Sequence, residues 1–534
     1  MSEAHPSKAS PSESRPSESR TAGRWVLAAT ILGSGMAFID GSVVAVALPS
    51  LQQALHADAS AMQWVVNGYT LMLGALILLG GAAGDRFGRR RVFMAGIVLF
   101  ALASLACGAA PDAPTLILAR AVQGVGGALM VPQSLALIAA SFPGPARGPA
   151  VGTWAAAAAL TTVIGPALGG WLVQAASWRA IFLINLPLAA ATLWLTWRHV
   201  PESRNPQAAP LDWRGAALVT SGLAALTWGA IAIARPGMAA FALILLGLAL
   251  LAAFVAHEAH ARAPMVPLGL FRSPVFSGVN IATLLLYGGL SGTLFFLPFA
   301  LIRLRGFSSA EAGAAFLPLT LLLAGLSRFT GALARRTGPR LPLVAGPAIA
   351  GVGFAWLGFG VSPGIAYVAG VLPAMVVLGI GMAITIPPLT TAMLDAVADR
   401  LSGTASGINN AVARVAGLLA VAILGSAALP LQSHLLAQRL DSQGVAASLR
   451  LAVAQSPAGY AEITLPPGIS PADAAMVATA VRAAFQDSFA AIGLVCAGLA
   501  AAAALCAALT IPPGTRRPPP DAVAQAALSA SDAS

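Results

Sequence analysis

The feature that most constrains this chain is a series of apolar segments, each about as long as a lipid bilayer is thick. A helix that crosses the hydrocarbon core needs about 20 mostly apolar residues. We therefore predict an all-α polytopic membrane protein. Fourteen segments of the chain meet the requirement, near residues 25–49, 61–83, 92–110, 114–141, 150–174, 180–198, 214–234, 239–257, 275–300, 310–333, 341–360, 365–393, 404–429 and 486–511.

The overall composition excludes a water-soluble fold. Hydrophobic residues make up 57% of the 534 residues and charged residues only 9%, whereas soluble domains carry roughly 25% charged residues. The net charge of +11 does not predict a nucleic-acid partner, because the arginines are dispersed among the apolar segments. The cysteines Cys107, Cys496 and Cys506 lie in apolar runs, which predicts neither disulfides nor a metal site.

Basic residues predict the orientation in the membrane, since cytoplasmic loops are enriched in Lys and Arg. With both termini inside, 20 of the 30 basic residues lie in cytoplasmic loops and tails, 7 lie outside, and Arg120, Arg328 and Arg414 lie within spans. Residues 1–23 and 512–534 are polar and predict disordered cytoplasmic tails. We expect a protein of the bacterial inner (plasma) membrane.

Residues 430–485 form a long segment between the last two spans, and the orientation places it outside. It contains Pro466-Pro467-Gly468 and short stretches of helical pattern. We interpret it as a tolerated surface insertion. The alternative is a small cap over the outer opening.

A repeated loop motif predicts two halves. Gly81-x-x-x-Asp85-Arg86-x-Gly88-Arg89-Arg90-Arg91 follows the second span, and Gly331-x-x-x-Arg335-Arg336-x-Gly338-Pro339-Arg340 follows the tenth. Transporters are often built from such repeats. The predicted arrangement is a six-helix half at 24–200, an inserted helix pair at 201–265, and a second six-helix half at 266–511.

The first of these loops resembles the signature loop of the major facilitator superfamily, carried here by Gly81, Asp85, Arg86, Gly88, Arg89 and Arg90. Glycines permit a turn within a few residues, and the arginines suit anionic headgroups. We expect Asp85 to accept hydrogen bonds from a neighbouring helix N-terminus. The resemblance implies the major facilitator fold and a loop that joins the two halves on the cytoplasmic side.

Four further stretches resemble the fourteen-span drug:proton antiporter family of the EmrB/QacA type. They begin at Phe38 in the first span, Leu118 in the fourth, Gly165 in the fifth and Gly403 in the thirteenth. Because they occur in order from residue 38 to about 425, the resemblance covers most of the chain. It implies export of small hydrophobic or amphiphilic compounds in exchange for protons.

Asp40 and Arg120 are the predicted proton-coupling residues. A charge at membrane depth costs at least about 2.5–3.5 kcal/mol on insertion scales, so Asp40 must face water, be protonated or pair with a cation. Our hypothesis is that Asp40 binds the transported proton; the alternative is a role in helix packing. Arg120 resembles the family's motif arginine and is expected to pair with Asp40, or else to bind backbone carbonyls. Gln123 lies one turn further on, where it is expected to supply a hydrogen bond in the same cavity.

The fifth span carries Gly165-Pro166 and Gly169-Gly170, which resemble the superfamily's antiporter motif. Proline bends the helix and glycines at a spacing of four permit close approach of another helix. This motif favours export over uptake. We interpret Arg414 in the thirteenth span as structural or conformational.

Trp64, Asn67 and Tyr287 are candidates for a substrate cavity, although Trp and Tyr also form belts at membrane interfaces. Asp40 is the only acidic residue that we place well inside the bilayer. The substrates are therefore expected to be neutral, zwitterionic or weakly charged amphiphiles.

The predicted function is secondary efflux driven by the proton gradient, with no cofactor. The sequence contains no phosphate-binding loop and no HExxH metalloprotease motif, so we do not predict an enzyme. Alternatives within transport are a dedicated exporter of a metabolite, antibiotic or lipid, and a proton symporter. A non-transporting sensor and an assembly partner of a pump with a periplasmic adaptor also remain open.

Overall fold

The computed structural model describes residues 16–142, 144–233, 237–398, 401–455, 458–460, 462–463 and 469–513. The first helix begins at Pro16, inside the segment predicted as a disordered tail, because proline suits the first position of a helix. The remaining parts of the two predicted tails, residues 1–15 and 514–534, lie outside the described residues.

The first group of elements runs from residue 16 to residue 199. It comprises α1 (Pro16–Ala54), α2 (Ala59–Phe87), α3 (Arg89–Ala109), α4 (Ala113–Ser141), the 3₁₀ turn η1 (Gly144–Ala146), α5 (Arg147–Ala175), α6 (Ala180–Leu183) and α7 (Asn185–His199).

The pair α8 (Trp213–Ala232) and α9 (Met238–His260) follows, and then a second group begins. The second group comprises η2 (Leu268–Arg272), α10 (Pro274–Phe299), the π-helical turn η3 (Ala300–Leu304), α11 (Ser309–Ala314), α12 (Leu317–Thr337), α13 (Arg340–Gly360), α14 (Val371–Asp395), α15 (Ser402–Ser442), α16 (Ala447–Gln455), β1 (Ala458–Gly459), β2 (Glu462–Ile463) and α17 (Pro471–Thr510).

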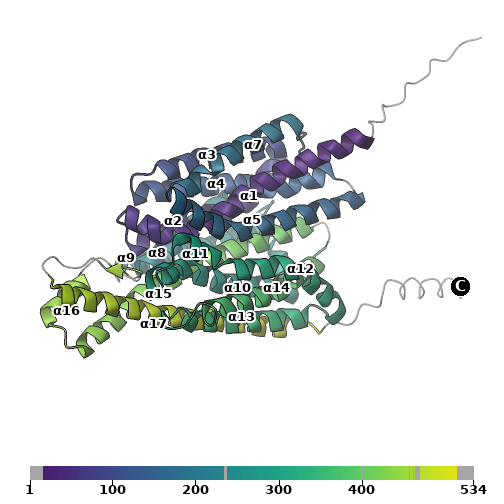
Figure 1. The fold of residues 1–534 in the computed structure, drawn as a ribbon. Coiled ribbons are helices and arrows are strands. Elements are labelled where there is room, and N and C mark those ends of the chain that lie inside the picture. Colours follow the sequence, from purple (N-terminus) through teal and green to yellow (C-terminus); the bar gives the residue numbers. More distant parts are fainter. Residues whose placement is uncertain are drawn as a thin grey trace, which may run out of the picture.

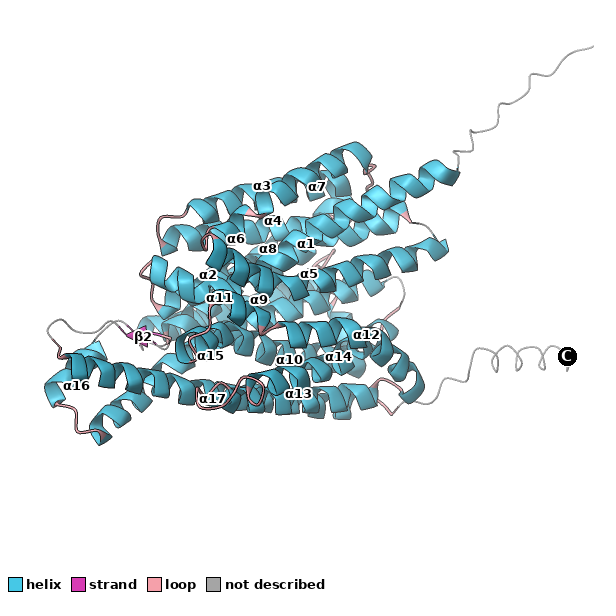
Figure 2. Cartoon of the chain, viewed as in Figure 1, coloured by secondary structure: helices cyan, strands magenta, loops and turns pink. Residues whose placement is uncertain are grey.

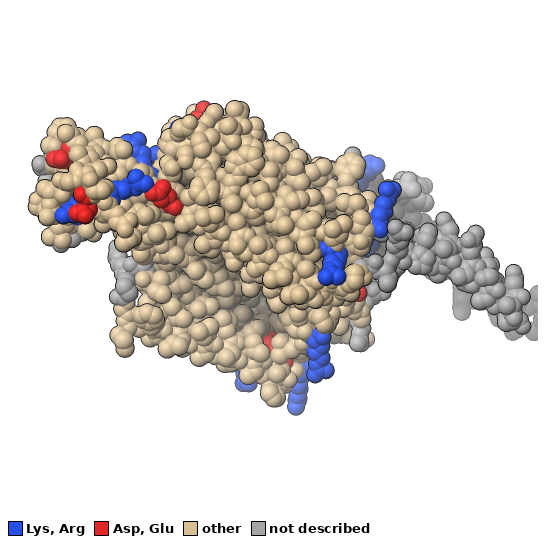
Figure 3. Space-filling model, turned by 90° about the horizontal axis from the view of Figure 1, so that it is seen from below, with Lys and Arg blue, Asp and Glu red and all other residues tan. Residues whose placement is uncertain are grey.

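Fourteen helical stretches of the described chain are long and apolar enough to cross a membrane. They coincide with the fourteen predicted spans, which confirms the all-α polytopic fold (Figure 2). The sixth span is formed by α6 and α7 together, and the ninth by α10 with η3. Figure 3 shows charged side chains at the two ends of the molecule and almost none on the broad surface between them in that view. This surface suits the hydrocarbon core of a bilayer.

Local sequence accounts for where several spans begin. The side chain of Asp58 accepts a hydrogen bond from the Ala61 amide at 2.8 Å, and Asp112 accepts one from the Thr115 amide at 2.9 Å. Such caps satisfy backbone donors that have no partner within the helix.

The two repeated loops each contain a glycine with a positive φ angle between consecutive helices. Gly88 separates α2 from α3 with φ at 108°, and Gly338 separates α12 from α13 with φ at 79°. Residues with a side chain rarely adopt these angles, so both glycines permit a sharp reversal between consecutive spans. The shared geometry agrees with the repeat expected from the sequence.

The helices of each group pack mainly against members of the same group, and the groups lie one above the other in Figure 1. α4 packs on α2 and α3, while α13 packs on α14 and α17. Contacts between groups come chiefly from α2 with α15 and from α5 with α11 and α12. The pair α8–α9 packs through α8 on both α2 and α15, so it covers the line where those two helices meet.

The bundle has two distinct ends. We call the end where α1 begins and α17 finishes the tail end, and the opposite end, where α16 lies, the hairpin end (Figure 1). Most of the predicted outer segment 430–485 is not loop. α15 continues to Ser442 and α17 begins at Pro471, because Leu436 and Leu440 pack against Val477 and Val481 in a small core of their own.

Tyr460 lies between β1 and β2 of this segment and is fully buried. Its hydroxyl accepts a hydrogen bond from Gln63 Nε2 of α2 at 2.9 Å and donates one to the Gly425 carbonyl of α15 at 3.2 Å. The ring contacts Phe296 and Phe299 of α10 at centroid distances of 5.0 and 5.2 Å. The segment therefore contributes a side chain to the interface between the two helix groups at the hairpin end.

Candidate functional site

The candidate site is a fully buried carboxylate held by polar side chains inside the first helix group. Asp40 of α1 has no exposed surface. One oxygen pairs with Nη1 of Arg120 from α4. The other accepts hydrogen bonds from Gln123 Nε2 at 2.8 Å and from Asn185 Nδ2 at 3.3 Å. The predicted pairing of Asp40 with Arg120 is present in the structure.

Arg120 makes further hydrogen bonds and a ring contact in addition to its ion pair with Asp40. Its Nη1 also donates to Gln123 Oε1 at 2.6 Å, and its Nε donates to the Val65 carbonyl at 3.2 Å. The guanidinium lies over the ring of Tyr69 at 4.3 Å, a favourable cation–π arrangement. Both roles expected for Arg120, an ion pair with Asp40 and a bond to a backbone carbonyl, are thus combined.

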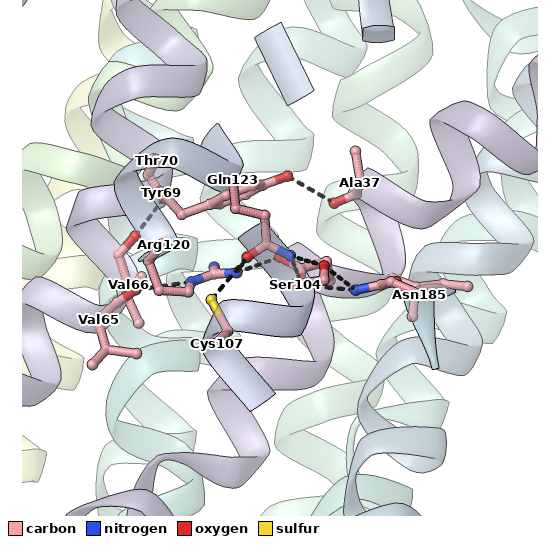
Figure 4. Close-up of polar contacts among 12 residues, drawn as sticks. Ala37, Val65, Val66, Tyr69, Thr70, Ser104, Cys107, Arg120, Gln123 and Asn185 are labelled. Carbon is pink, nitrogen blue, oxygen red and sulfur yellow. Dashed lines mark hydrogen bonds and ion pairs between the residues drawn. The ribbon is translucent and has the colours of Figure 1, made fainter. Parts of the chain in front are cut away.

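These groups come from α1, α2, α3, α4 and α7. Figure 4 shows Arg120, Gln123, Ser104 and Asn185 pointing toward one another. α3 adds Ser104, whose hydroxyl oxygen accepts hydrogen bonds from Gln123 at 2.7 Å and from Asn185 at 3.2 Å. Sequence reasoning did not assign Ser104 or Asn185 to the site. The sequence could have indicated Asn185, because it is a polar amide within an apolar run. It could not have indicated Ser104, because serine is common in membrane helices.

The predicted cavity residues lie in three helices, α2, α4 and α10, and have different surroundings. Gln123 is buried within the Asp40 network. Trp64 is half-buried and packs edge-on against Trp228 of α8 at 5.9 Å, so it contacts the inserted pair. Asn67 is fully buried, and neither polar atom of its side chain has a hydrogen-bond partner within the described structure. Tyr287 of α10 is half-buried.

The glycines of the antiporter motif bring α5 against both helix groups. A Cβ atom on Gly165 would collide with Ser42 of α1, and one on Gly169 would collide with Val43. Gly170 and Pro166 lie equally close to α11, where they face Ser309 and Gly313. α5 therefore connects the segment of α1 next to Asp40 to the second helix group.

The signature loop differs from the expectation for Asp85. The Asp85 carboxylate accepts from Arg89, with Nη2 at 2.8 Å, one turn away in the sequence. The N-terminus of α3 is filled instead by Glu202, which accepts from the backbone amides of Arg90 at 3.1 Å and Arg91 at 3.2 Å. Glu202 can occupy this position because Gly88 has no side chain that would collide with its carboxylate. The loop contacts the segment after α7, and none of its described hydrogen bonds reaches the second group.

No group of three or more His, Cys, Asp or Glu side chains among the described residues is arranged to hold a metal ion. Asp40 and Arg120 form a buried ion pair within the fourteen-span helical bundle.

Comparison with known proteins identifies the class. A family model described as Major Facilitator Superfamily matches residues 30–421. The chain belongs to this superfamily and is a membrane transporter rather than an enzyme.

The chain is also similar to curated proteins. It is 36% identical over 410 residues to the puromycin resistance protein pur8 of Streptomyces alboniger, which covers 75% of this chain and 81% of that protein. It is 34% identical to the multidrug resistance protein Stp of Mycobacterium tuberculosis, with 75% of each chain covered. The tetracenomycin C resistance and export protein of Streptomyces glaucescens is 32% identical, over 75% of this chain and 74% of that one.

Solved structures share the fold. A bacterial homologue of the human lysosomal transporter Spinster, inward-facing and unoccupied, matches with a TM-score of 0.65 at 18% identity, covering 93% of this chain and 98% of that one. The inward-open xylose transporter XylE from E. coli matches with a TM-score of 0.57 at 15% identity, covering 92% and 97%. At these identities the likeness concerns the fold alone.

Proposed function

We propose that the chain exports small hydrophobic or amphiphilic compounds across the bacterial inner membrane in exchange for protons, and that Asp40 carries the proton. The relatives named for puromycin resistance, multidrug resistance and tetracenomycin C export support the direction of transport. The observation that carries the proposal is the buried Asp40–Arg120 pair, the ion pair deepest within the described spans.

The bonding around Asp40 suits a group that alternates between charged and neutral forms. The ionised carboxylate accepts from Arg120, Gln123 and Asn185. A proton on Asp40 would remove the charge that holds Arg120 and would turn one oxygen into a donor. Asn185 Oδ1 is buried without a hydrogen-bond partner in the described structure, so an acceptor lies close by for that donor.

Contacts along α1 and α5 give the proton a way to influence the interface between the helix groups. Ser42 and Val43 lie two and three residues after Asp40 and pack on Gly165 and Gly169. The neighbouring residues of α5, Pro166 and Gly170, pack on α11. A small shift of α1 on protonation would therefore move α5 against the second group, since tightly packed helices do not deform independently.

We place the tail end in the cytoplasm, with both termini there. The adjoining ends of α2 and α3 at this end carry four arginines, as expected for the cytoplasmic side. The hairpin end, with the projecting parts of α15 and α17, then lies outside.

The test is accumulation of ethidium or Hoechst dye in a host that lacks its own pumps. Cells with the wild-type chain should accumulate less dye than cells with empty vector, and a protonophore should abolish the difference. Asp40→Asn should behave like empty vector at equal membrane abundance. Asp112→Asn is the matched control, because Asp112 only caps α4 and asparagine caps as well as aspartate. Export by Asp40→Asn that the pH gradient still drives would overturn the proposal.

A second candidate is a dedicated exporter of one antibiotic. It is favoured by relatives whose names specify single compounds, such as the cephamycin export protein CmcT of Amycolatopsis lactamdurans, 35% identical over 401 residues. A panel of unrelated antibiotics separates the two, since a dedicated exporter would raise resistance to one compound or one chemical series only.

A further inference from the structure

Arg414 is a second arginine at membrane depth. α2 and α15 run in opposite directions and meet along their length. Gln63 faces Gly425 near the hairpin end and Leu78 faces Gly407 toward the tail end. Between these points, a Cβ on Gly74 would lie 2.9 Å from the Cβ of Arg414. Gly74 is near the middle of α2 (Ala59–Phe87), so Arg414 lies near the middle of the bilayer.

The guanidinium of Arg414 has no polar partner among the described residues in this conformation. Within the described part of the chain it makes no hydrogen bond and no ion pair, and the residue is half-buried. Arg120, at similar depth, is fully buried and has Asp40, Gln123 and the Val65 carbonyl as acceptors. The two arginines therefore differ: the Arg120 guanidinium has several hydrogen-bond acceptors, whereas the Arg414 guanidinium has none within the described chain.

No acidic side chain competes for Arg414. Asp40 is the only carboxylate in the middle of the described spans, and its oxygens are occupied by Arg120, Gln123 and Asn185. An arginine without an acceptor at this depth is costly. It is tolerated where water or an anion can reach it, which agrees with the partial exposure of Arg414.

The surroundings of Arg414 come from both helix groups. Gly74 of α2 faces it directly, and on α10 a Cβ on Gly288, the residue after Tyr287, would lie 3.7 Å from the carbonyl oxygen of Ala416, two residues from Arg414. No hydrogen bond of Tyr287 occurs among the described residues. The Arg414 guanidinium can donate two parallel hydrogen bonds, and near it lie a tyrosine hydroxyl without a described partner and apolar helix surface. This combination suits a hydrophobic molecule that bears a carboxylate.

We propose that Arg414 is the substrate-binding cation of this transporter, and that it selects amphiphilic compounds carrying a carboxylate. This inference rests on the proposed export function and names its substrate class. Two parallel hydrogen bonds from the guanidinium to the carboxylate would fix the ligand at mid-membrane. The ring of Tyr287 and the apolar surfaces of α2 and α10 would cover its apolar body.

The experiment uses the purified full-length chain and two dyes that differ only at the group in question, rhodamine B, which has a free carboxylate, and its ethyl ester. The wild type should bind rhodamine B about tenfold more tightly than the ester, the difference that a good charge-assisted bidentate contact supplies. Arg414→Gln should bind both dyes equally, at the affinity of the ester. Arg414→Lys, which keeps the charge but loses the fork, should fall between.

Arg340→Gln is the control for loss of one positive charge. Arg340 begins α13 and donates to the Ala508 carbonyl at 2.7 Å, so this variant should keep the preference for the free acid. Equal binding of acid and ester by the wild type, or no binding of rhodamine B, would overturn the proposal. So would equal weakening of both dyes in Arg414→Gln, which indicates a structural role.

The dye-binding result for Arg414 can be distinguished from the result of the export assay. Arg414→Gln should still export the ester in a protonophore-sensitive manner from cells. If the wild-type chain exports neither dye but binds the acid preferentially, export fails while the assignment of Arg414 stands.

Discussion

The polar groups around Asp40 form one connected network in which Gln123 is the central member. Its amide nitrogen bonds Asp40 and Ser104, and its amide oxygen accepts from Arg120. Every one of these partners is buried, so each has little chance of replacing a lost bond with water. Buried polar groups that lose a partner cost about 1–3 kcal/mol each.

We expect Gln123→Leu, a change of similar volume, to reduce the rate of dye efflux by about tenfold or more, because Arg120, Asp40 and Ser104 each lose a hydrogen bond of about 1 kcal/mol net or more. Gln123→Glu should also fail, since a second carboxylate would compete with Asp40 for Arg120. Initial efflux rates normalised to protein abundance measure this. A rate within twofold of wild type for Gln123→Leu would mean that the network is not needed for transport.

The sequence predicted this site in part. Asp40 and Arg120 stood out because single charges in apolar segments need a partner, and each is the other's partner in the structure. Ser104 and Asn185 were not assigned, because their role depends on how α3 and α7 are rotated against α1. Rotation of a helix about its axis depends on packing with neighbours, which local sequence does not reveal.

At the level of single helices, α5 offers a matched pair of positions. Gly169 faces the side chain and backbone of Val43 in α1 with no room for a methyl group, whereas at Gly152 in the same helix no atom lies within 4 Å of the position that a Cβ would take. Gly169→Ala should abolish efflux and lower the thermal stability of the purified protein, because α5 must move away from α1. Gly152→Ala should match the wild type in both measurements. Equal behaviour of the two variants would contradict the packing described for α5.

The hairpin-end segment contributes a contact that joins the two helix groups. Tyr460→Ala would remove a ring packed on Phe296 and Phe299 and leave Gln63 and the Gly425 carbonyl without its hydroxyl. We expect α2 and α15 to separate more often at this end. A cysteine at Ser426, a buried position beside Gly425, should then react several-fold faster with a membrane-impermeant maleimide in a chain whose native cysteines are replaced.

Tyr460→Phe is the control for this experiment. It keeps the ring contacts, so its effect should be smaller than that of alanine. An unchanged reaction rate in Tyr460→Ala would show that the contact does not hold the hairpin end closed.

The helices α15 and α17 show where sequence reasoning stopped short. Their apolar cores were found as spans, yet their extensions to Ser442 and from Pro471 were interpreted as a loop. The extensions carry charged residues at helical spacing, and their apolar positions are too sparse to indicate a span. They are stable as helices because they pack on each other, a contact between segments far apart in the sequence.

At the scale of the whole molecule, the hydrogen bonds that join the two helix groups within the described chain lie toward the hairpin end. Tyr460 bridges α2 and α15 there, α5 packs on α11, and Arg303 of η3 donates to the Pro49 carbonyl of α1 at 3.4 Å. The described bonds of the signature loop at the tail end stay on the side of the first group. These contacts join the two groups at the hairpin end.

The orientation of the whole molecule can be tested by labelling. Leu451 in α16 is 62% exposed and Phe87 at the end of α2 is 53% exposed. In a cysteine-free chain, Leu451→Cys should react with an impermeant maleimide in intact spheroplasts. Phe87→Cys should react only after the membrane is permeabilised. The reverse pattern would show that the tail end lies outside and would contradict the proposed orientation.

The central claim is that Asp40 exchanges a proton for substrate. The most direct measurement is proton release by the purified protein in weakly buffered detergent solution when an exported dye is added. The account predicts that the wild type releases protons in proportion to bound dye, and that Asp40→Asn binds the dye without releasing any. Equal release by the wild type and Asp40→Asn would contradict it, because the proton would then come from another group.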